Sequence, residues 1–524
     1  MPFQSETTPQ AKMSTKPTPA VCESAKAEFP PTASANAAAS HPQTLDPTDW
    51  TELRAQAHRM LDDMLDYTED IRQRPVWQPI PDIVRGNFRT PIPHEPTPLE
   101  DVHAEFLQYI LPFTQGNVHP GFMGWVNGGG TAVGMIAEML AAGLNANLGG
   151  RDHMPVEVER QLIEWVRDIF GFPTGASGLF VTGTSMANAI AVVVARDVAL
   201  GYDVRTNGIG PNDIGTNAHR LTAYASAGAH SCIAKALDLA GIGTGALRLV
   251  RTDARGRIDQ AALQQAIADD RSAGRVPFLV VGTAGTVDIG AVDDLATLAD
   301  LCHREKLWFH VDGAFGALAT LTPDLAPLLH GIEQADSLAF DFHKWAQVPF
   351  DAGFILVRDG ELHRRAFASS AAYLTQSERG LAAGAPWLSD FGPDLSRGFR
   401  ALKTWFTLKV YGTDAIGAVI SQTCRLARSL RDRILQTPEL ELLAPVELNI
   451  VCFRYRAEPS NEFNRELVIQ LQEHGRVAPS TTMIGDRLAI RAAIVNHRTS
   501  QAEIDALLDD TLALGKALKL RQTP

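Results

Sequence analysis

The chain has 524 residues, 45% of them hydrophobic and 20% charged, with a formal net charge of −13 at pH 7. This length predicts two or three domains, because a single hydrophobic core stops growing well below it. The acidic balance argues against a nucleic-acid-binding protein and against one held on an anionic membrane surface.

The cysteines are few and widely separated, and no two of them have C-x-x-C spacing. They are Cys22, Cys232, Cys302, Cys424 and Cys452. This pattern predicts a reduced, cytoplasmic protein without a metal site. The first residues do not have the pattern of a secretory signal, and no apolar run approaches the length that crosses a bilayer.

The N-terminal part divides into a tail and a helical arm. Residues 1–47 are rich in Ala, Pro, Thr and Ser and predict a disordered tail. Residues 49–72 show apolar side chains at helical spacing, with Thr48 or Asp49 as the cap. The segment 48–130 continues as a proline-rich arm, which we expect to have no core of its own and to pack on something else, such as a partner subunit.

Residues 131–410 alternate between β-rich and helical runs, which predicts a large α/β domain. Helices are expected at 132–144 and 156–170 and then between the strands, at 187–200, 232–241, 260–269 and 293–305. Strands are expected at 179–182, 221–225, 247–251, 277–282, 307–311, 337–340 and 353–357. The alternation is typical of a mostly parallel seven-stranded sheet covered by helices.

The remaining residues, 411–524, predict a small α+β domain. A helix at 401–410 leads into it. Its expected elements are helices at 415–435, 461–473 and 501–518 and strands at 448–455 and 488–493. The three helices and two strands are enough for a layer of helices on a small sheet.

Two charged residues follow neighbouring apolar strands. In ADSLAFDFHKW (335–345) a buried strand ends just before Lys344, and in LWFHVDGA (307–314) another ends at Asp312. Desolvation makes such a lysine a usable Schiff-base nucleophile, and a buried carboxylate needs a cation such as the protonated nitrogen of pyridoxal phosphate (PLP). Taken singly, a surface lysine and a helix-capping aspartate are open alternatives. The 32 residues between them, however, are one strand–helix–strand step, which places both on one sheet edge.

Other strand ends carry residues suited to the same cofactor. Thr184 and Ser185 in TGTSMAN begin a helix and predict a phosphate site, or else an ordinary helix cap. His230 in SAGAHSCIAKA could stack on the cofactor ring or be a plain loop histidine. Thr283 in VGTAGTVDIG could bond the ring hydroxyl or the phosphate, or merely turn the chain.

Together these segments resemble the group II pyridoxal-dependent decarboxylases, the family of the aromatic-L-amino-acid, histidine and glutamate decarboxylases. The resemblance extends from about residue 49 to residue 514. It is carried by HPGFMGW, TGTSMAN, AHSCIAKA, GTAGTVDIGAVDDL, FHVDGAFGA, ADSLAFDFHKW, RGFRALKTWF and LAIRAAIVNHRTS. The pair HVDGA and DFHKW is the most specific part.

The resemblance implies the PLP-dependent transferase fold type I, which is aspartate-aminotransferase-like, and a homodimer with active sites at the interface. It implies PLP as cofactor and a small amino acid as substrate. Lys344 would carry the Schiff base, Asp312 would pair with the pyridine nitrogen, and His230 and Ala314 would lie on the two ring faces. The remaining cofactor contacts would be Thr184, Ser185, Thr283, Asp341 and His343.

One segment leaves the product open. In the animal and plant aromatic-acid enzymes a mobile loop carries a tyrosine that returns a proton to Cα, whereas the matching residues 375–395 contain no tyrosine. We therefore expect decarboxylation to an amine, with Lys344, His230 or a loop residue as proton donor, and keep an oxidative, aldehyde-forming reaction as the alternative. A catalytically silent regulatory homologue is a third possibility. Lys344, Asp312 and His230 together argue against it.

The substrate side chain is expected near HPGFMGWVNGGG (119–130). Trp125 could pack on an aromatic substrate, and Gly128 lets the backbone approach a ligand closely. A plain loop and a buried tryptophan are the alternatives. An aromatic L-amino acid is the expected substrate.

Overall fold

The computed structural model describes residues 44–209, 220–369 and 376–522. Most of the predicted tail, residues 1–43, therefore lies outside the described residues. Two units are distinguished, divided between Ala55 and Gln56. In the first unit Asp49 caps helix α1 (Trp50–Glu69), since its Oδ1 accepts the N–H groups of Thr51 and Glu52 at 2.7 and 3.1 Å.

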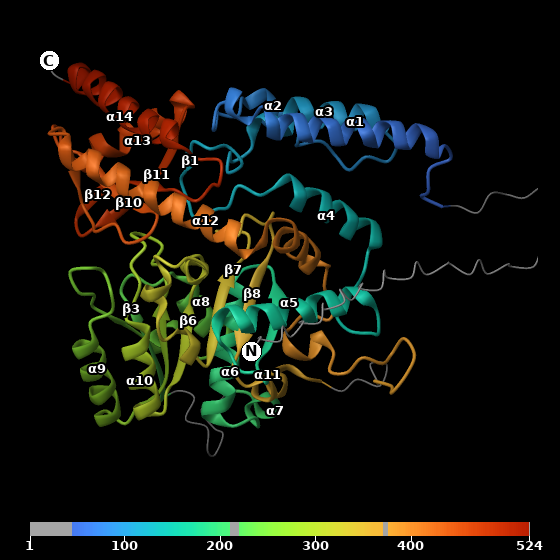
Figure 1. The fold of residues 1–524 in the computed structure, drawn as a ribbon, viewed down its shortest axis with the longest axis vertical. Helices are drawn as coiled ribbons and strands as arrows, with labels where there is room; N and C mark the ends of the chain where they lie inside the picture. The colour runs from blue at the N-terminus through green and yellow to red at the C-terminus, as the bar shows by residue number, and fades with distance from the viewer. Residues whose placement is uncertain (1–43, 210–219, 370–375, 523–524) are drawn as a thin grey trace, which may run out of the picture. The chain divides into compact units, whose positions relative to one another are not determined.

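The second unit contains a seven-stranded sheet in the order β2-β8-β7-β6-β5-β3-β4 (Figure 1). The strands are β2 (Ser177–Val181), β3 (Leu221–Ser226), β4 (Leu247–Val250), β5 (Val276–Thr283), β6 (Trp308–Asp312), β7 (Ser337–Asp341) and β8 (Gly353–Val357). Only β8 runs antiparallel to its neighbours, β2 and β7. All seven predicted strands and the mostly parallel α/β class are confirmed.

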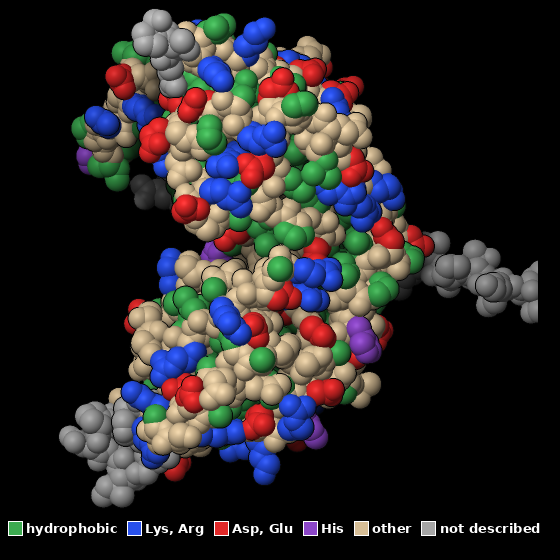
Figure 2. Space-filling view, turned by 90° about the vertical axis from the view of Figure 1, so that its left-hand side faces the viewer, with side chains coloured by type: hydrophobic (Ala, Val, Ile, Leu, Met, Phe, Trp, Pro, Cys, Tyr) green, Lys and Arg blue, Asp and Glu red, His purple; other side chains and the backbone are tan. Residues whose placement is uncertain are grey.

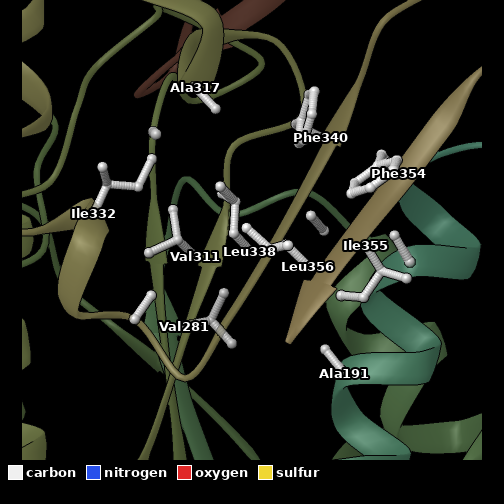
Figure 3. Close-up of a cluster of buried hydrophobic side chains, with 14 of the residues drawn as sticks. Ala191, Val281, Val311, Ala317, Ile332, Leu338, Phe340, Phe354, Ile355 and Leu356 are labelled. Atoms are coloured by element: carbon white, nitrogen blue, oxygen red, sulfur yellow. The ribbon is translucent and has the colours of Figure 1, made fainter. Parts of the chain in front are cut away.

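Helices cover this sheet and share a continuous apolar core with it. They are α5 (Met154–Phe170), α6 (Thr184–Leu200), α8 (Cys232–Leu239), α9 (Gln260–Ser272), α10 (Leu295–Glu305) and α11 (Gly360–Phe367). Helix α4 (Ala132–Leu144) packs against α12 (Arg400–Gln436), and the short α7 (Val204–Asn207) packs against α6. Figure 3 shows Leu338, Phe340 and Leu356 of β7 and β8 among the core side chains. Because these strands are buried on both faces, they are continuous apolar runs rather than alternating ones.

The proline-rich arm packs on other parts of its own chain. It forms the short helices α2 (Asp82–Gly86) and α3 (Leu99–Glu105), and Tyr67, Ile71 and Leu111 make a small apolar cluster. The N–H of Val76 donates to the carbonyl of Gly475 at 2.8 Å. Strand β1 (Phe122–Met123) pairs in parallel with β11 (Ala478–Ile484), so the arm completes the C-terminal sheet.

That second sheet has the order β1-β11-β12-β10-β9. Its other strands are β9 (Leu440–Leu442), β10 (Ile450–Tyr455) and β12 (Arg487–Ala493), and the accompanying helices are α12 (Arg400–Gln436), α13 (Asn461–His474) and α14 (Gln501–Gln522). The two helices expected at 401–410 and 415–435 form the single element α12, broken at Gly412 with φ 75°. The boundary predicted between residues 410 and 411 falls inside this helix and stays a prediction.

The surface mixes charges of both signs. Figure 2 shows basic, acidic and hydrophobic side chains interspersed on one face of the molecule. Among the helices described, none combines the length and the apolar character that a membrane span needs.

Candidate active site

The predicted polar residues meet at the carboxyl edge of the large sheet. Strands β5, β6 and β7 end in Thr283, Asp312 and Asp341, and α6 begins at Thr184 shortly after β2. Thr283 and Asp312 are direct register partners on parallel strands, and Asp312 in turn pairs with Ala339 of β7. This edge is where open α/β sheets bind ligands.

Lys344 and Thr184 are joined through Asp341. The lysine Nζ lies 2.9 Å from Asp341 Oδ2, and Asp341 Oδ1 accepts the backbone N–H of Thr184 at 2.7 Å. His343 is buried next to them, with its Nε2 3.5 Å from Asp341 Oδ2 and its Nδ1 accepting the N–H of Ala352 at 3.0 Å. Burial lowers the pKa of His343. A neutral His343 with its proton on Nε2 therefore supports the carboxylate that holds the lysine.

Asp312 is buried, with 3% of its surface exposed. Its Oδ1 accepts the N–H of Ala314 at 3.1 Å, and its Oδ2 accepts Nδ2 of Asn188 at 3.1 Å and lies 3.7 Å from Sγ of Cys232. Burial raises the pKa of Asp312, and the charge of Lys344, the Ala314 N–H and the Asn188 amide oppose that rise. A cation beside the carboxylate would favour its ionised form further.

His230, Ala314 and Ser185 border this group. His230 is exposed, and its Nδ1 accepts the N–H of Cys232 at 3.2 Å, which leaves Nε2 for other partners. Ala314 is partly buried, and Ser185 is exposed in the first turn of α6. The charge of His230 acts on Asp312 and lowers its pKa.

Two buried hydroxyls at this edge have no hydrogen-bond partner. They are Oγ1 of Thr184, at the start of α6, and Oγ1 of Thr283, at the end of β5. Buried polar atoms are normally paired, so unpaired ones at a strand edge indicate a ligand. The residues present fit PLP. The N-terminus of α6 suits a phosphate, the amine of Lys344 suits an aldehyde, and the buried carboxylate of Asp312 suits a protonated ring nitrogen.

Trp125 and Gly128 are the two substrate-binding residues predicted in the glycine-rich segment, and only Gly128 lies next to Lys344. The N–H of Gly128 donates to the carbonyl of His343 at 3.1 Å, and a Cβ at position 128 would lie 2.3 Å from the carbonyl oxygen of Lys344. Only glycine fits there. Trp125 instead lines a hollow of about 380 Å³ with Trp77, Phe113 and Phe122, and the lining does not include Lys344 or Asp312.

The sequence reasoning missed four buried residues linked to Asp312. Asn188 and Cys232 contact its carboxylate, and His310 and Ser337 are connected to it through Asn188. A signal was present for two of them, since Asn188 interrupts an apolar helix face and His310 lies within an apolar strand. Buried polar groups need partners, but the sequence does not say which ones.

Comparisons with known proteins agree with this geometry. Residues 81–456 match the model of the pyridoxal-dependent decarboxylase conserved domain. The aromatic-L-amino-acid decarboxylase of Bacillus atrophaeus is 33% identical over 90% of this chain and 96% of its own, and the phenylacetaldehyde synthase of Arabidopsis thaliana is 28% identical over 88% and 95%. The structure of Oryza sativa TDC with PLP and tryptamine superimposes with a TM-score of 0.82 at 25% identity, over 91% of this chain and 100% of that one. The chain therefore belongs to the pyridoxal-dependent decarboxylase family, as a PLP-dependent carboxy-lyase with the type I fold.

Proposed function

We propose that this protein decarboxylates an aromatic L-amino acid to the corresponding amine and carbon dioxide, with Lys344 as the Schiff-base lysine. The observation that carries the proposal is the meeting of Lys344, Asp312 and Thr184 at one sheet edge, with Lys344 and Thr184 bridged by Asp341. The relatives that decarboxylate aromatic amino acids support the substrate class.

The roles follow from the contacts. When bound, PLP supplies an electron sink for the pair left at Cα when carbon dioxide departs. Thr184, with Ser185 and the first turn of α6, would hold the phosphate, and Thr283 would meet the cofactor through its unpaired hydroxyl. Asp312 would hold the ring nitrogen in its protonated form.

A proton must reach Cα after the carboxylate leaves. His230 is the side chain best suited to hold it, because its Nδ1 is occupied by the Cys232 N–H and its Nε2 is left at the exposed side of the site. Lys344 is the second donor, since Asp341 keeps its amine at the same edge. General acid catalysis of this kind requires only a donor within hydrogen-bond reach of Cα.

The segment around Gly128 lies next to the candidate Schiff-base lysine. This glycine lies against the backbone of Lys344, so the chain approaches the reacting centre without a side chain in between. We propose that Gly128 bounds the substrate side chain. Trp125 lines a hollow that does not include Lys344, so it is not part of this proposal.

A second product is favoured by residues 375–395. They contain no tyrosine. Trp387, in the same segment, is buried, and the Arg151 guanidinium lies 4.2 Å from the centre of its ring. Its indole N–H donates to the carbonyl of Ala383. If protonation at Cα is slow, molecular oxygen can accept two electrons from that carbon and become hydrogen peroxide, after which water hydrolyses the carbon–nitrogen bond and releases the aldehyde and ammonia. The 28% identical Arabidopsis thaliana relative is a phenylacetaldehyde synthase.

We also propose that the protein acts as a homodimer in the cytoplasm. Helix α4 exposes Met139, Leu140 and Leu144, with exposed fractions of 53%, 43% and 62%, and such an apolar patch is typical of an interface. Four cysteines, Cys232 among them, are buried free thiols, in keeping with a reducing compartment.

We further propose that the chain has three folded regions, residues 48–130, 131–410 and 411–524.

A panel of L-amino acids tests the proposed reaction. The holoenzyme is incubated with aromatic, acidic and basic amino acids while carbon dioxide, oxygen uptake, amine, aldehyde and hydrogen peroxide are measured. The proposal predicts amine and carbon dioxide from an aromatic substrate without oxygen uptake. Aldehyde and peroxide would favour the second product, and carbon dioxide only from a charged amino acid would contradict the substrate class.

A further inference from the structure

A series of buried side chains leads from Asp312 into the interior of the large sheet. Asn188 of α6 bonds to Asp312 at 3.1 Å and to Nε2 of His310 at 2.8 Å. Nδ1 of His310 bonds to Oγ of Ser337 at 2.8 Å, and that oxygen accepts the indole N–H of Trp308 at 2.8 Å. The series thus joins a helix and two strands, and its members are at least 91% buried.

Chemistry sets the direction of every bond in this series. Trp308 can only donate, so Ser337 accepts from it and is free to donate its own proton to His310. An ionised Asp312 can only accept, so Asn188 turns its NH₂ to the carboxylate and its oxygen to His310. His310 must then carry its proton on Nε2 and leave Nδ1 bare. Each hydrogen bond on the path from Trp308 to Asp312 is therefore donated toward Asp312, while the Asn188 amide also donates to Sγ of Cys232 at 3.1 Å.

A second buried histidine provides a comparison for this arrangement. His363 is also fully buried and also bonds through Nδ1 to a serine hydroxyl, Oγ of Ser177, at 2.8 Å. There the series of side chains stops, because Nε2 of His363 bonds to no described side chain. Of these two histidines, His310 is the one whose series continues to a charged group.

We propose that Asn188 and His310 are positioning residues, which hold the Asp312 carboxylate in one orientation and, through aligned donors, keep it an ionised partner for the ring nitrogen of PLP. Donors in series polarise one another, so the bond that reaches Asp312 is stronger than that of an isolated amide. The inference rests on the proposed role of Asp312 and adds the residues that set it.

The test compares three variants of the holoenzyme. His310→Phe removes the series behind Asn188, His310→Gln keeps an N–H that can reach the Asn188 oxygen, and His363→Phe removes the matched histidine elsewhere. For each we measure PLP affinity, the wavelength of the visible band of the bound cofactor, kcat and KM. We expect His310→Phe to weaken PLP binding about three- to tenfold, shift the band and lower kcat with little change in KM. His310→Gln should restore much of this, and His363→Phe should leave all four unchanged.

A further measurement is nitrogen-15 NMR of histidine-labelled holoenzyme, with the His310 signal assigned as the one absent from His310→Gln. We expect that signal to be from a neutral ring with its proton on Nε2. A proton on Nδ1 of His310 would overturn the proposal, and so would equal effects of His310→Phe and His363→Phe. Asp312→Asn distinguishes failure of the proposed function from failure of the positioning role. If Asp312→Asn leaves the visible band and PLP affinity unchanged, the proposed role of Asp312 is wrong. If Asp312→Asn changes them and His310→Phe does not, only the positioning role of His310 is wrong.

Discussion

The Nζ of Lys344 lies 2.9 Å from Oδ2 of Asp341, and the other oxygen of the same carboxylate accepts the N–H of Thr184. One buried side chain thus links the candidate Schiff-base lysine to the candidate phosphate helix. Asp341 is 2% exposed, so its two partners satisfy a charge that would otherwise be costly to bury.

Substitutions of Asp341 should separate its two contacts. In Asp341→Asn the side-chain oxygen can still accept the Thr184 N–H, so we expect PLP affinity within about threefold of the original. In Asp341→Leu the N–H is left unpaired, which costs roughly 1–3 kcal/mol, and affinity should fall about tenfold or more. Fluorescence titration of the apoprotein with PLP measures both. Equal losses in the two variants would show that the bond to Thr184 does not matter.

The unpaired hydroxyls predict opposite effects on stability and on binding. Thr184→Val and Thr283→Val replace a buried, unpaired hydroxyl by a methyl group, so the apoprotein should be as stable as before or more so. PLP affinity should nevertheless fall by about tenfold in each. Thr404→Val is the matched control, because its Oγ1 is also buried without a partner. Reduced affinity in the control, or none in the two site variants, would contradict the assignment.

Removal of the Asp312 charge should slow turnover strongly. Asp312→Asn keeps the size of the side chain but cannot stabilise a protonated ring nitrogen, and loss of one such preorganised interaction lowers kcat by about 10²–10³-fold. Steady-state kinetics on the best substrate measures this. The negative control is Asp324→Asn, because that aspartate bonds to Ser421 outside the site. A change of less than about threefold in kcat for Asp312→Asn would not agree with the proposed role.

His363 predicts a specific acid sensitivity. Burial lowers its pKa to about 3, well below an unfolded value near 6.5, so the unfolded chain binds the extra proton between these pH values. Stability is therefore lost as the pH falls below about 6.5, by about 2–3 kcal/mol at pH 4.5. His363→Phe should lose less stability than the original between pH 7 and pH 4.5, as followed by denaturant midpoints. The control is His330→Phe, which changes an exposed histidine and should behave like the original protein. Identical pH profiles for the original and both variants would show that His363 does not cause the acid sensitivity.

The sequence predicted the edge of the large sheet well, for a simple physical reason. Strands β5, β6 and β7 are buried on both faces, so each is an apolar run that must end where a polar residue such as Thr283, Asp312 or Asp341 appears. The order of strands and helices then places these residues together. Topology therefore placed these residues on one edge without any knowledge of side-chain contacts.

What the sequence did not predict depends on partners distant in the chain. Strand β11 was missed because only its first three residues are fully buried, and β1 because it is two residues long within a glycine-rich segment. The bonds of Asn188 to Asp312 and His310 span 124 and 122 residues, and no local pattern encodes them. Trp125 was expected near the substrate side chain with Gly128, and it lines a hollow that includes neither Lys344 nor Asp312.

The most direct test of the central claim is to reduce the holoenzyme with borohydride and map the modified peptide. A Schiff base between PLP and Lys344 predicts a yellow protein whose cofactor becomes fixed, after reduction, to the peptide that contains Lys344. Lys344→Ala should be inactive and should not be labelled. A cofactor fixed at a different lysine, or a colourless protein that takes up no PLP, would contradict the account.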